Sequence, residues 1–143
     1  MLAIGCDHGG FELKQEIIKY LAEKNIPYKD FGCDTPEAVD YPVIGKAVAH
    51  AVANGECEKG ILLCGTGIGI SIAANKVKGI RAALCSDCFS AEATRLHNDA
   101  NILAMGGRVV GPGLAVKIVD TFLNTPFSGE ERHRRRISMI EEE

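Results

Sequence analysis

Short apolar runs alternate along the chain with stretches in which apolar residues recur at helical spacing. Unbroken runs of this length are typical of strands that are buried on both faces of a sheet. The clearest such run is 61–64, and we predict five strands in all, over residues 2–6, 26–32, 61–64, 81–85 and 102–105. A stretch with helical periodicity follows each strand, and a charged segment at 129–143 is also predicted to be helical.

Apolar stripes indicate the buried side of the predicted helices. In the helix that begins near Asp40 and ends at Gly55, the stripe consists of Val43, Ala47, Val48, Ala51 and Val52. In the helix over 112–123, it consists of Leu114, Ile118, Val119 and Phe122. Repeats of one strand and one helix call for a parallel sheet that is covered on both faces. We therefore predict a single α/β domain over residues 1–143. It is a Rossmann-like, doubly wound, three-layer fold with a five-stranded parallel sheet and a C-terminal helix.

The third strand runs into a loop with glycines in alternate positions, Gly65, Gly67 and Gly69. Strand, glycine loop and helix place Cys64 at the carboxyl edge of the sheet, where ligands of open α/β sheets bind. Glycines allow close approach of the backbone, and a helix N-terminus favours negative charge. The segment therefore fits a base or nucleophile beside an anion site, and it also fits a plain tight turn. The dinucleotide fingerprint would need a glycine where Ile70 stands.

Composition narrows the classes of function. The chain of 143 residues has a net charge of −3, which gives no broad basic field for nucleic acid. No apolar run approaches the ~18 residues of a membrane span. The amino end meets Asp7 without a preceding basic region, unlike a signal peptide. We therefore expect a cytoplasmic protein whose six cysteines are free thiols.

Polar residues gather where the predicted strands begin or end. Asp7 and His8 follow the first strand, and Thr66 follows the third, so both groups share the carboxyl edge. His97 and Asn98 precede the fifth strand, and their position depends on the loop between helix and strand. Each has a structural alternative. Asp7 could cap a helix, His97 and Asn98 could end one, and a buried cysteine is often inert.

Taken together, these residues belong to a set of motifs that stand in order along the chain. The motifs are Gly5-Cys6-Asp7-His8-Gly9-Gly10-Phe11, Asp40-Tyr41-Pro42, Cys64-Gly65-Thr66-Gly67-Ile68-Gly69, His97-Asn98 and Gly107-Arg108-Val109-Val110-Gly111, with Arg132 and Arg136 near the end. The set resembles ribose-5-phosphate isomerase B and the related galactose-6-phosphate isomerase subunits over nearly the whole chain. Some family members use a glutamate just beyond the glycine loop as the base. Residues 68–72 contain no acid here, so the chain resembles the members that use cysteine.

The resemblance implies an aldose–ketose isomerase that needs no cofactor and no metal. It would interconvert D-ribose 5-phosphate and D-ribulose 5-phosphate through an enediolate, in the non-oxidative pentose phosphate pathway. Hexose phosphates such as allose 6-phosphate would be side substrates. The implied catalytic residues are Cys64 as the base for the C2 proton, His97 as the ring-opening acid, Asp7 as the carrier of protons between O1 and O2, and Thr66 as an oxyanion donor.

The resemblance also implies the residues that bind the phosphorylated sugar. They are Asp7, His8, Tyr41, Gly65, Thr66, Gly67, Ile68, Gly69, Asn98, Arg108, Arg132 and Arg136. On a helix, Arg132 and Arg136 would project from one face. In this family the active site is shared between subunits, so we expect a homodimer or a dimer of dimers. Without the family, the segment 130–136 would fit a solvated, charged tail.

Other functions remain open at this point. The chain could be one subunit of a galactose-6-phosphate isomerase, or a module that binds sugar phosphates or nucleotides without catalysis. Cys85 and Cys88 have the C-x-x-C spacing of a thiol oxidoreductase, although the surrounding residues do not match that motif. A zinc site at this pair would need two more ligands at finger-like spacing, and the sequence places none.

Overall fold

The computed structural model describes residues 1–142. Within this range five strands form one parallel sheet in the order β2-β1-β3-β5-β4. The strands are β1 (Leu2–Cys6), β2 (Tyr28–Asp30), β3 (Lys59–Cys64), β4 (Ala82–Leu84) and β5 (Ile102–Gly106). The predicted strands are confirmed, but β2 and β4 are shorter than the apolar runs suggest. Each is an edge strand and pairs on one side only, β2 with β1 and β4 with β5.

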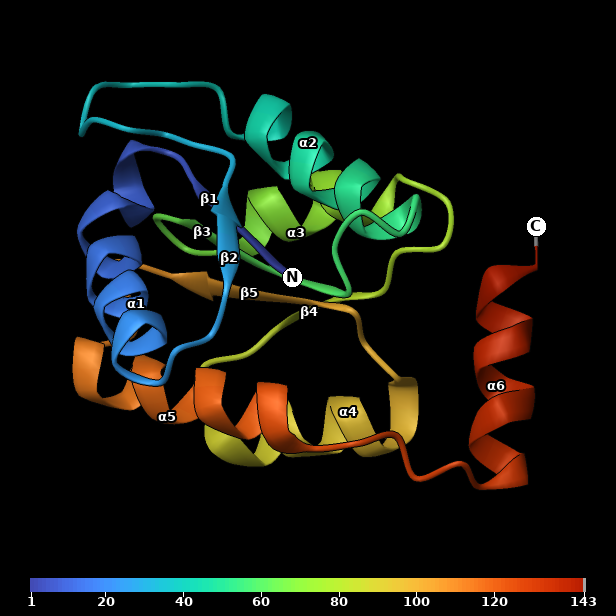
Figure 1. Cartoon of the computed structure of the whole chain (residues 1–143). Coiled ribbons are helices and arrows are strands. Elements are labelled where there is room, and N and C mark those ends of the chain that lie inside the picture. Colours follow the sequence, from blue (N-terminus) through green and yellow to red (C-terminus); the bar gives the residue numbers. More distant parts are fainter. Residues whose placement is uncertain (143) are drawn as a thin grey trace.

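Helices cover both faces of the sheet, as Figure 1 shows. One face carries α1 (Phe11–Glu23), α4 (Cys88–Asn98) and α5 (Pro112–Asn124), and the other carries α2 (Tyr41–Ala53) and α3 (Ile68–Asn75). A 3₁₀ turn, η1 (His8–Gly10), joins β1 to α1. The buried side chains form two clusters, one on each face of the sheet. This arrangement confirms the predicted three-layer, doubly wound α/β fold.

The predicted stripes are wrong at two positions, Val43 and Leu114. Val43 is 68% exposed and Leu114 is 43% exposed. Both lie in the first turn of their helix but off its buried face: Ala115, next to Leu114, is fully buried, and Gly45 rather than Val43 faces α3. Small residues decide the packing of α2 instead: a side-chain carbon at Gly45 would lie 3.0 Å from Cγ1 of Ile70 on α3. The two helices therefore pack closely where glycine leaves room, and Val43 stays outside this contact.

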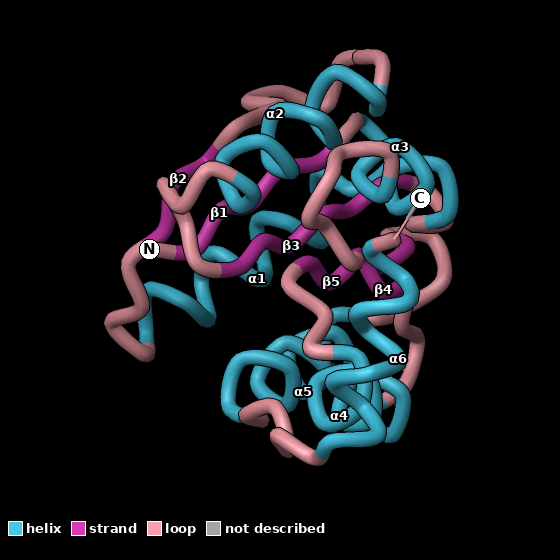
Figure 2. The backbone as a smooth tube through the Cα atoms, turned by 90° about the vertical axis from the view of Figure 1, so that its right-hand side faces the viewer, coloured by secondary structure: helices cyan, strands magenta, loops and turns pink. Residues whose placement is uncertain are grey.

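The last helix, α6 (Glu131–Glu141), stands apart from the layers and packs against α4. Figures 1 and 2 show α6 beyond the amino edge of the sheet, on the side opposite to the loop that follows β3. Met139 and Ile140 on this helix are 62% and 59% exposed. None of the helices within residues 1–142 is long and apolar enough to cross a membrane.

Candidate active site

The carboxyl ends of β1 and β3 lie side by side at the point where the strand order reverses. β1 lies between β2 and β3, so the chain turns one way after β1 and the other way after β2. Such a switch point leaves a crevice between the loops of the two strands, and ligands of open α/β sheets bind there. Cys6 pairs with Leu63, and the next residues in the two strands are Asp7 and Cys64.

The Cys64 thiol lies beneath the glycine loop and is 5% exposed. Its Sγ accepts a hydrogen bond from the backbone N–H of Gly67 at 3.0 Å. Gly67 precedes α3 and has a left-handed conformation with φ of 81°. A side-chain carbon there would lie 2.7 Å from the backbone carbonyl carbon of Met105. Glycine is therefore required for the turn that brings this amide to the sulfur.

Thr66, Ile68 and Gly69 complete the loop at the start of α3. Thr66 Oγ1 accepts a hydrogen bond from the N–H of Ile68, the first residue of α3, at 3.1 Å. The Tyr41 ring lies against Gly69, where an added side-chain carbon would be 2.8 Å from the tyrosine hydroxyl oxygen. The loop between Cys64 and Gly69 thus presents backbone donors at the N-terminus of a helix, a suitable arrangement for anionic oxygen.

Asp7 and His8 lie beside this loop, in the turn after β1. Asp7 is buried, and its Oδ1 accepts a hydrogen bond from the N–H of Gly9 at 2.8 Å. Asp7 therefore caps η1, as the structural alternative predicts. A side-chain carbon on Gly9 would lie 2.7 Å from the backbone nitrogen of Gly65, so the two loops are in close contact. The exposed His8 accepts a hydrogen bond at Nδ1 from the N–H of Val39 at 3.4 Å.

Arg108 brings a positive charge to the same edge from the end of β5. Its backbone N–H donates to the carbonyl of Gly65 at 3.0 Å. A side-chain carbon on Gly65 would lie 3.3 Å from Nη1 of Arg108, so the guanidinium lies along the loop. We call the group formed by Asp7, His8, Tyr41, Cys64 to Gly69 and Arg108 the thiol cluster.

His97 and Asn98 do not join the thiol cluster of their own chain. They form the end of α4, and the carbonyl of Asn98 accepts a hydrogen bond from Nε of Arg81 at 2.9 Å. Arg81 precedes Ala82, which pairs with Ile102, and Ile102 pairs with Gly60. Gly60 is four residues before Cys64 on β3, a distance on the order of 13 Å along the strand. His97 and Asn98 therefore lie at the amino edge of the sheet.

The residues predicted on α6 lie with His97. The His97 ring stacks on the His133 ring, with centroids 4.5 Å apart and planes 19° apart. Arg132 donates from Nε to Nε2 of His133 at 3.3 Å and pairs with Glu130 at 3.1 Å. Arg136 follows Arg132 by one turn of the same helix. We call His97, Asn98, Arg132, His133 and Arg136 the histidine–arginine cluster.

His133 is the site residue that the sequence did not reveal. It is buried, although it stands among arginines in a segment that fits an exposed tail. Burial, together with the nearby His97, Arg132 and Arg136, lowers the pKa of His133. A neutral ring also accepts the hydrogen bond from Arg132. Because most residues of 130–136 are charged, the sequence did not distinguish His133 from its exposed neighbours. Its stacking on His97 in the structure identifies it.

The cysteine pair Cys85 and Cys88 lacks the features of a redox site. Cys85 is buried, and burial together with the charge of Asp87 raises the pKa of its thiol to about 11. A disulfide oxidoreductase needs a thiolate at neutral pH. All six cysteines are free thiols. Among residues 1–142 no three Cys, His, Asp or Glu side chains are grouped in a way that could hold a metal ion.

Comparison with known proteins identifies the family of the chain. A sequence profile of the Ribose/Galactose Isomerase family matches residues 2–140. The chain belongs to this family of isomerases. It is 52% identical to ribose-5-phosphate isomerase B of Escherichia coli over 139 residues, which are 97% of this chain and 93% of that protein. It is 42% identical to galactose-6-phosphate isomerase subunit LacB of Clostridium acetobutylicum, over 99% of this chain and 82% of that protein.

A solved structure of ribose-5-phosphate isomerase B from Clostridium thermocellum has the same fold. It superimposes with a TM-score of 0.96 at 54% identity, covering 98% of this chain and 94% of that chain. The isomerase family therefore accounts for both the sheet order and the position of the glycine loop.

Proposed function

We propose that this isomerase interconverts D-ribose 5-phosphate and D-ribulose 5-phosphate, without a cofactor, through an enediolate. The observation that carries the proposal is the position of Cys64, whose sulfur accepts a hydrogen bond from the backbone N–H of Gly67 in the glycine loop, at the switch point of the sheet. A proton-transfer reaction next to a developing oxyanion needs this combination of base and donors. We further propose that residues 1–143 act as one domain, in the cytoplasm and in the non-oxidative pentose phosphate pathway.

In this mechanism the Cys64 thiolate removes the proton from C2 of the open-chain aldose. The electrons of the C2–H bond form the C1–C2 double bond, and negative charge develops on O1. The amides of Gly65 to Gly69 and the Thr66 hydroxyl stabilise this oxyanion. Asp7 carries a proton between O1 and O2, and its hydrogen bond to Gly9 fixes the carboxylate for this task. The thiol then returns its proton to C1, which yields the ketose.

Ring opening and phosphate binding would require both clusters. We propose that His97 protonates the ring oxygen, that Asn98 contributes a further oxyanion donor, and that Arg132 and Arg136 bind the phosphate together with Arg108 and His8. The two clusters lie at opposite edges of the sheet in one chain. A two-fold axis that sets two sheets antiparallel would bring each amino edge against the partner's carboxyl edge.

We therefore propose a homodimer, or a dimer of dimers, in which each active site combines the thiol cluster of one chain with the histidine–arginine cluster of the other. Exposed apolar side chains near the glycine loop support this assembly. Ile68 and Ile72 on α3 are 50% and 56% exposed, and Tyr41 and Val43 on α2 are exposed as well. Apolar surface that gathers around a functional loop is typical of an interaction site, and a second copy of this chain would cover it.

Conversion of ribose 5-phosphate to ribulose 5-phosphate by the purified protein tests the proposed reaction. Cys64→Ala should lower kcat by roughly 10²–10⁴ because a general base is lost, while binding of the phosphorylated sugar persists. The double variant Cys85→Ala/Cys88→Ala serves as a control for thiol loss and should keep the wild-type rate. A Cys64→Ala variant that keeps nearly full activity would mean that the thiol is only packing.

A galactose-6-phosphate isomerase subunit is the alternative that the similarity to LacB favours. Side-by-side rates on ribose 5-phosphate, allose 6-phosphate and galactose 6-phosphate distinguish the two. We expect the pentose phosphate to react fastest and allose 6-phosphate to be a side substrate. A faster reaction of galactose 6-phosphate, with or without a second type of subunit, would favour the alternative. Binding of all three sugars without turnover would indicate a non-catalytic module.

A further inference from the structure

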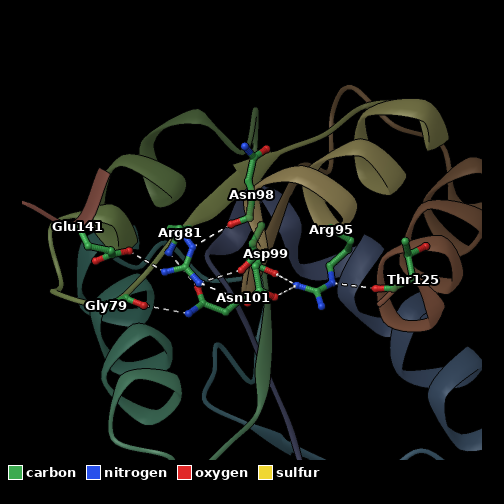
Figure 3. Close-up of polar contacts among 9 residues, drawn as sticks. Gly79, Arg81, Arg95, Asn98, Asp99, Asn101, Thr125 and Glu141 are labelled. Carbon is green, nitrogen blue, oxygen red and sulfur yellow. Dashed lines mark hydrogen bonds and ion pairs between the residues drawn. The ribbon is translucent and has the colours of Figure 1, made fainter. Parts of the chain in front are cut away.

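Arg81 joins three segments at the amino edge of the sheet, as Figure 3 shows. It stands just before β4, and its side chain is 18% exposed. The guanidinium donates from Nε to the carbonyl of Asn98 and from Nη2 to the carbonyl of Asp99, both at 2.9 Å. From Nη1 it donates to Oε1 of Glu141 at 2.6 Å. One side chain thus connects the start of β4, the end of α4 and the end of α6.

The contacts with Asn98 and Asp99 fix the last turn of α4. The helix ends there because Asp99 has a left-handed conformation, with φ of 46°. The last carbonyls of a helix have no partner within the helix and carry partial negative charge. The planar fork of Arg81 satisfies two of them at once, a geometry that a single ammonium group does not offer. The orientation of His97 and Asn98 in this turn therefore depends on Arg81.

Arg95 holds the same turn from another side, through hydrogen bonds to Asp99, Ala100 and Thr125. It donates from Nη1 to Oδ1 of Asp99 at 2.8 Å and to the carbonyl of Ala100 at 2.7 Å. Its Nε donates to the carbonyl of Thr125, just beyond α5, at 3.0 Å. Figure 3 shows Arg81 and Arg95 on opposite sides of Asp99. Arg95 thus ties α4 to α5, whereas Arg81 ties α4 to α6.

The ion pair between Arg81 and Glu141 fixes the direction of α6. Near its start, α6 is held by the stack of His133 on His97, and at its last residue by Glu141. Eight residues separate these two contacts, about 12 Å along the helix. A groove of about 740 Å³, lined by Lys78, Arg81 and Ile140 among others, lies beside the ion pair. The end of α6 therefore rests on a polar contact more than on close apolar packing, since Met139 and Ile140 beside it are mostly exposed.

We propose that Arg81 is a positioning residue of the isomerase site. It orients Asn98 and His97 through the carbonyls at the end of α4, and it orients Arg132 and Arg136 through Glu141. This inference rests on the proposed function, because it assigns Arg81 to the half of the active site that the histidine–arginine cluster supplies. The two effects act through different contacts of the guanidinium, so different variants separate them.

Three variants and a control test the proposal. Glu141→Gln removes the ion pair with α6 and leaves the carbonyl contacts of Arg81. Arg81→Met removes all of its side-chain contacts. Arg81→Lys keeps a charge for Glu141 but cannot reach both carbonyls in the same geometry. Lys78→Met removes an exposed positive charge from the wall of the same groove, and so controls for a change in net charge. Steady-state kinetics on ribose 5-phosphate and calorimetric titration with inorganic phosphate are measured for each.

Glu141→Gln should weaken phosphate binding and raise KM by about 3- to 10-fold with kcat nearly unchanged, because binding is lost equally in the ground state and in the transition state. Arg81→Met should show the same increase in KM and, in addition, a fall in kcat of about tenfold. Arg81→Lys should restore KM toward the wild-type value while kcat stays low. Lys78→Met should match the wild type. A purely structural role would instead lower activity in proportion to the folded fraction, with KM unchanged.

Wild-type values of KM, kcat and phosphate affinity in Arg81→Met and Glu141→Gln would overturn the proposal, as would a loss that follows only the folded fraction. Failure of the proposed function gives a different result, since the wild-type protein would then not convert ribose 5-phosphate. In that case the titration with phosphate still decides the role of Arg81. Weaker phosphate binding by Glu141→Gln than by the wild type supports the positioning role of Arg81. Equal binding, or no phosphate binding even by the wild type, contradicts that role.

Discussion

The thiol of Cys64 is held in place by backbone that lies three residues further along the chain. The N–H of Gly67 donates to the sulfur, and a thiolate accepts such a hydrogen bond more strongly than a neutral thiol does. The position of Cys64 at the end of an apolar run, just before a glycine loop, could be predicted from the sequence. The direction of the Gly67 amide could not, because it depends on a left-handed turn packed against Met105.

His133 provides a second test at the residue scale. Its pKa is lowered in the folded protein, from an ordinary value of 6.5. The folded state therefore binds fewer protons at His133 than the unfolded state, and the docking of α6 should weaken as the pH falls through about 6.5. His133→Phe keeps a ring against His97 and cannot be protonated.

Hydrogen exchange of the α6 amides, compared between the two proteins at each pH, measures this effect. Protection in the wild type should decline relative to His133→Phe as the pH is lowered from 8 to 5. The charge of Glu130 raises the pKa of His133 and that of Arg136 lowers it, and both residues are unchanged in the variant. An equal decline in the two proteins would show that His133 does not titrate in the docked helix.

At the scale of elements, hydrophobic periodicity predicts a strand or helix correctly where one face of the element is buried along its whole length. It fails at Val43 and Leu114, which lie off the buried faces that contain Gly45 and Ala115. Charge periodicity on α6 likewise predicts a helix but not its contacts. An apolar stripe indicates only that a surface is covered, and the contacts with neighbouring elements decide which residues of the stripe are buried.

The loop between β3 and α3 makes a specific prediction about glycine. Gly67→Ala places a side chain at φ of 81° and 2.7 Å from the backbone carbon of Met105, which cannot move without disturbing β5. We expect a loss of stability of about 3 kcal/mol or more, and loss of isomerase activity, because the turn that places the amide near the sulfur is broken. Chemical denaturation and the ribose 5-phosphate assay measure the two effects.

Gly55→Ala is the matched control for backbone strain. Gly55 has φ of 85°, yet no atom lies within 4 Å of an added side-chain carbon. It should lose only about 1 kcal/mol of stability from the left-handed conformation, and its activity should be retained. Similar losses of stability in the two variants would show that strain, rather than the contact with Met105, explains the need for glycine at position 67.

At the scale of the whole molecule, the sequence predicts which residues are candidates for the site, but not how they are arranged. The motifs name both clusters, and parallel strand topology predicts that Asp7 and Cys64 meet at one edge. The position of His97 depends on the turn at Asp99, which ends α4 at the opposite edge. Sequence spacing carries no information about that turn, so the separation of the two clusters emerges only from the folded chain.

The separation leads to the central claim, that each active site combines two copies of the chain. Complementation between inactive variants tests it most directly. Cys64→Ala inactivates the thiol cluster, and Arg132→Ala/Arg136→Ala inactivates the histidine–arginine cluster. Mixing these two variants under conditions of subunit exchange should restore roughly a quarter of the wild-type activity, since half of the random dimers contain one intact composite site.

The control mixture combines His97→Asn with Arg132→Ala/Arg136→Ala. Both defects lie in the same cluster, so no dimer of these chains contains an intact site and the mixture should stay inactive. Exchange is followed in both mixtures by native mass spectrometry of differently labelled subunits. Recovery in the first mixture alone is the result that the composite site predicts. If subunits exchange and no activity returns in the first mixture, each chain serves its own thiol, and the composite site is contradicted.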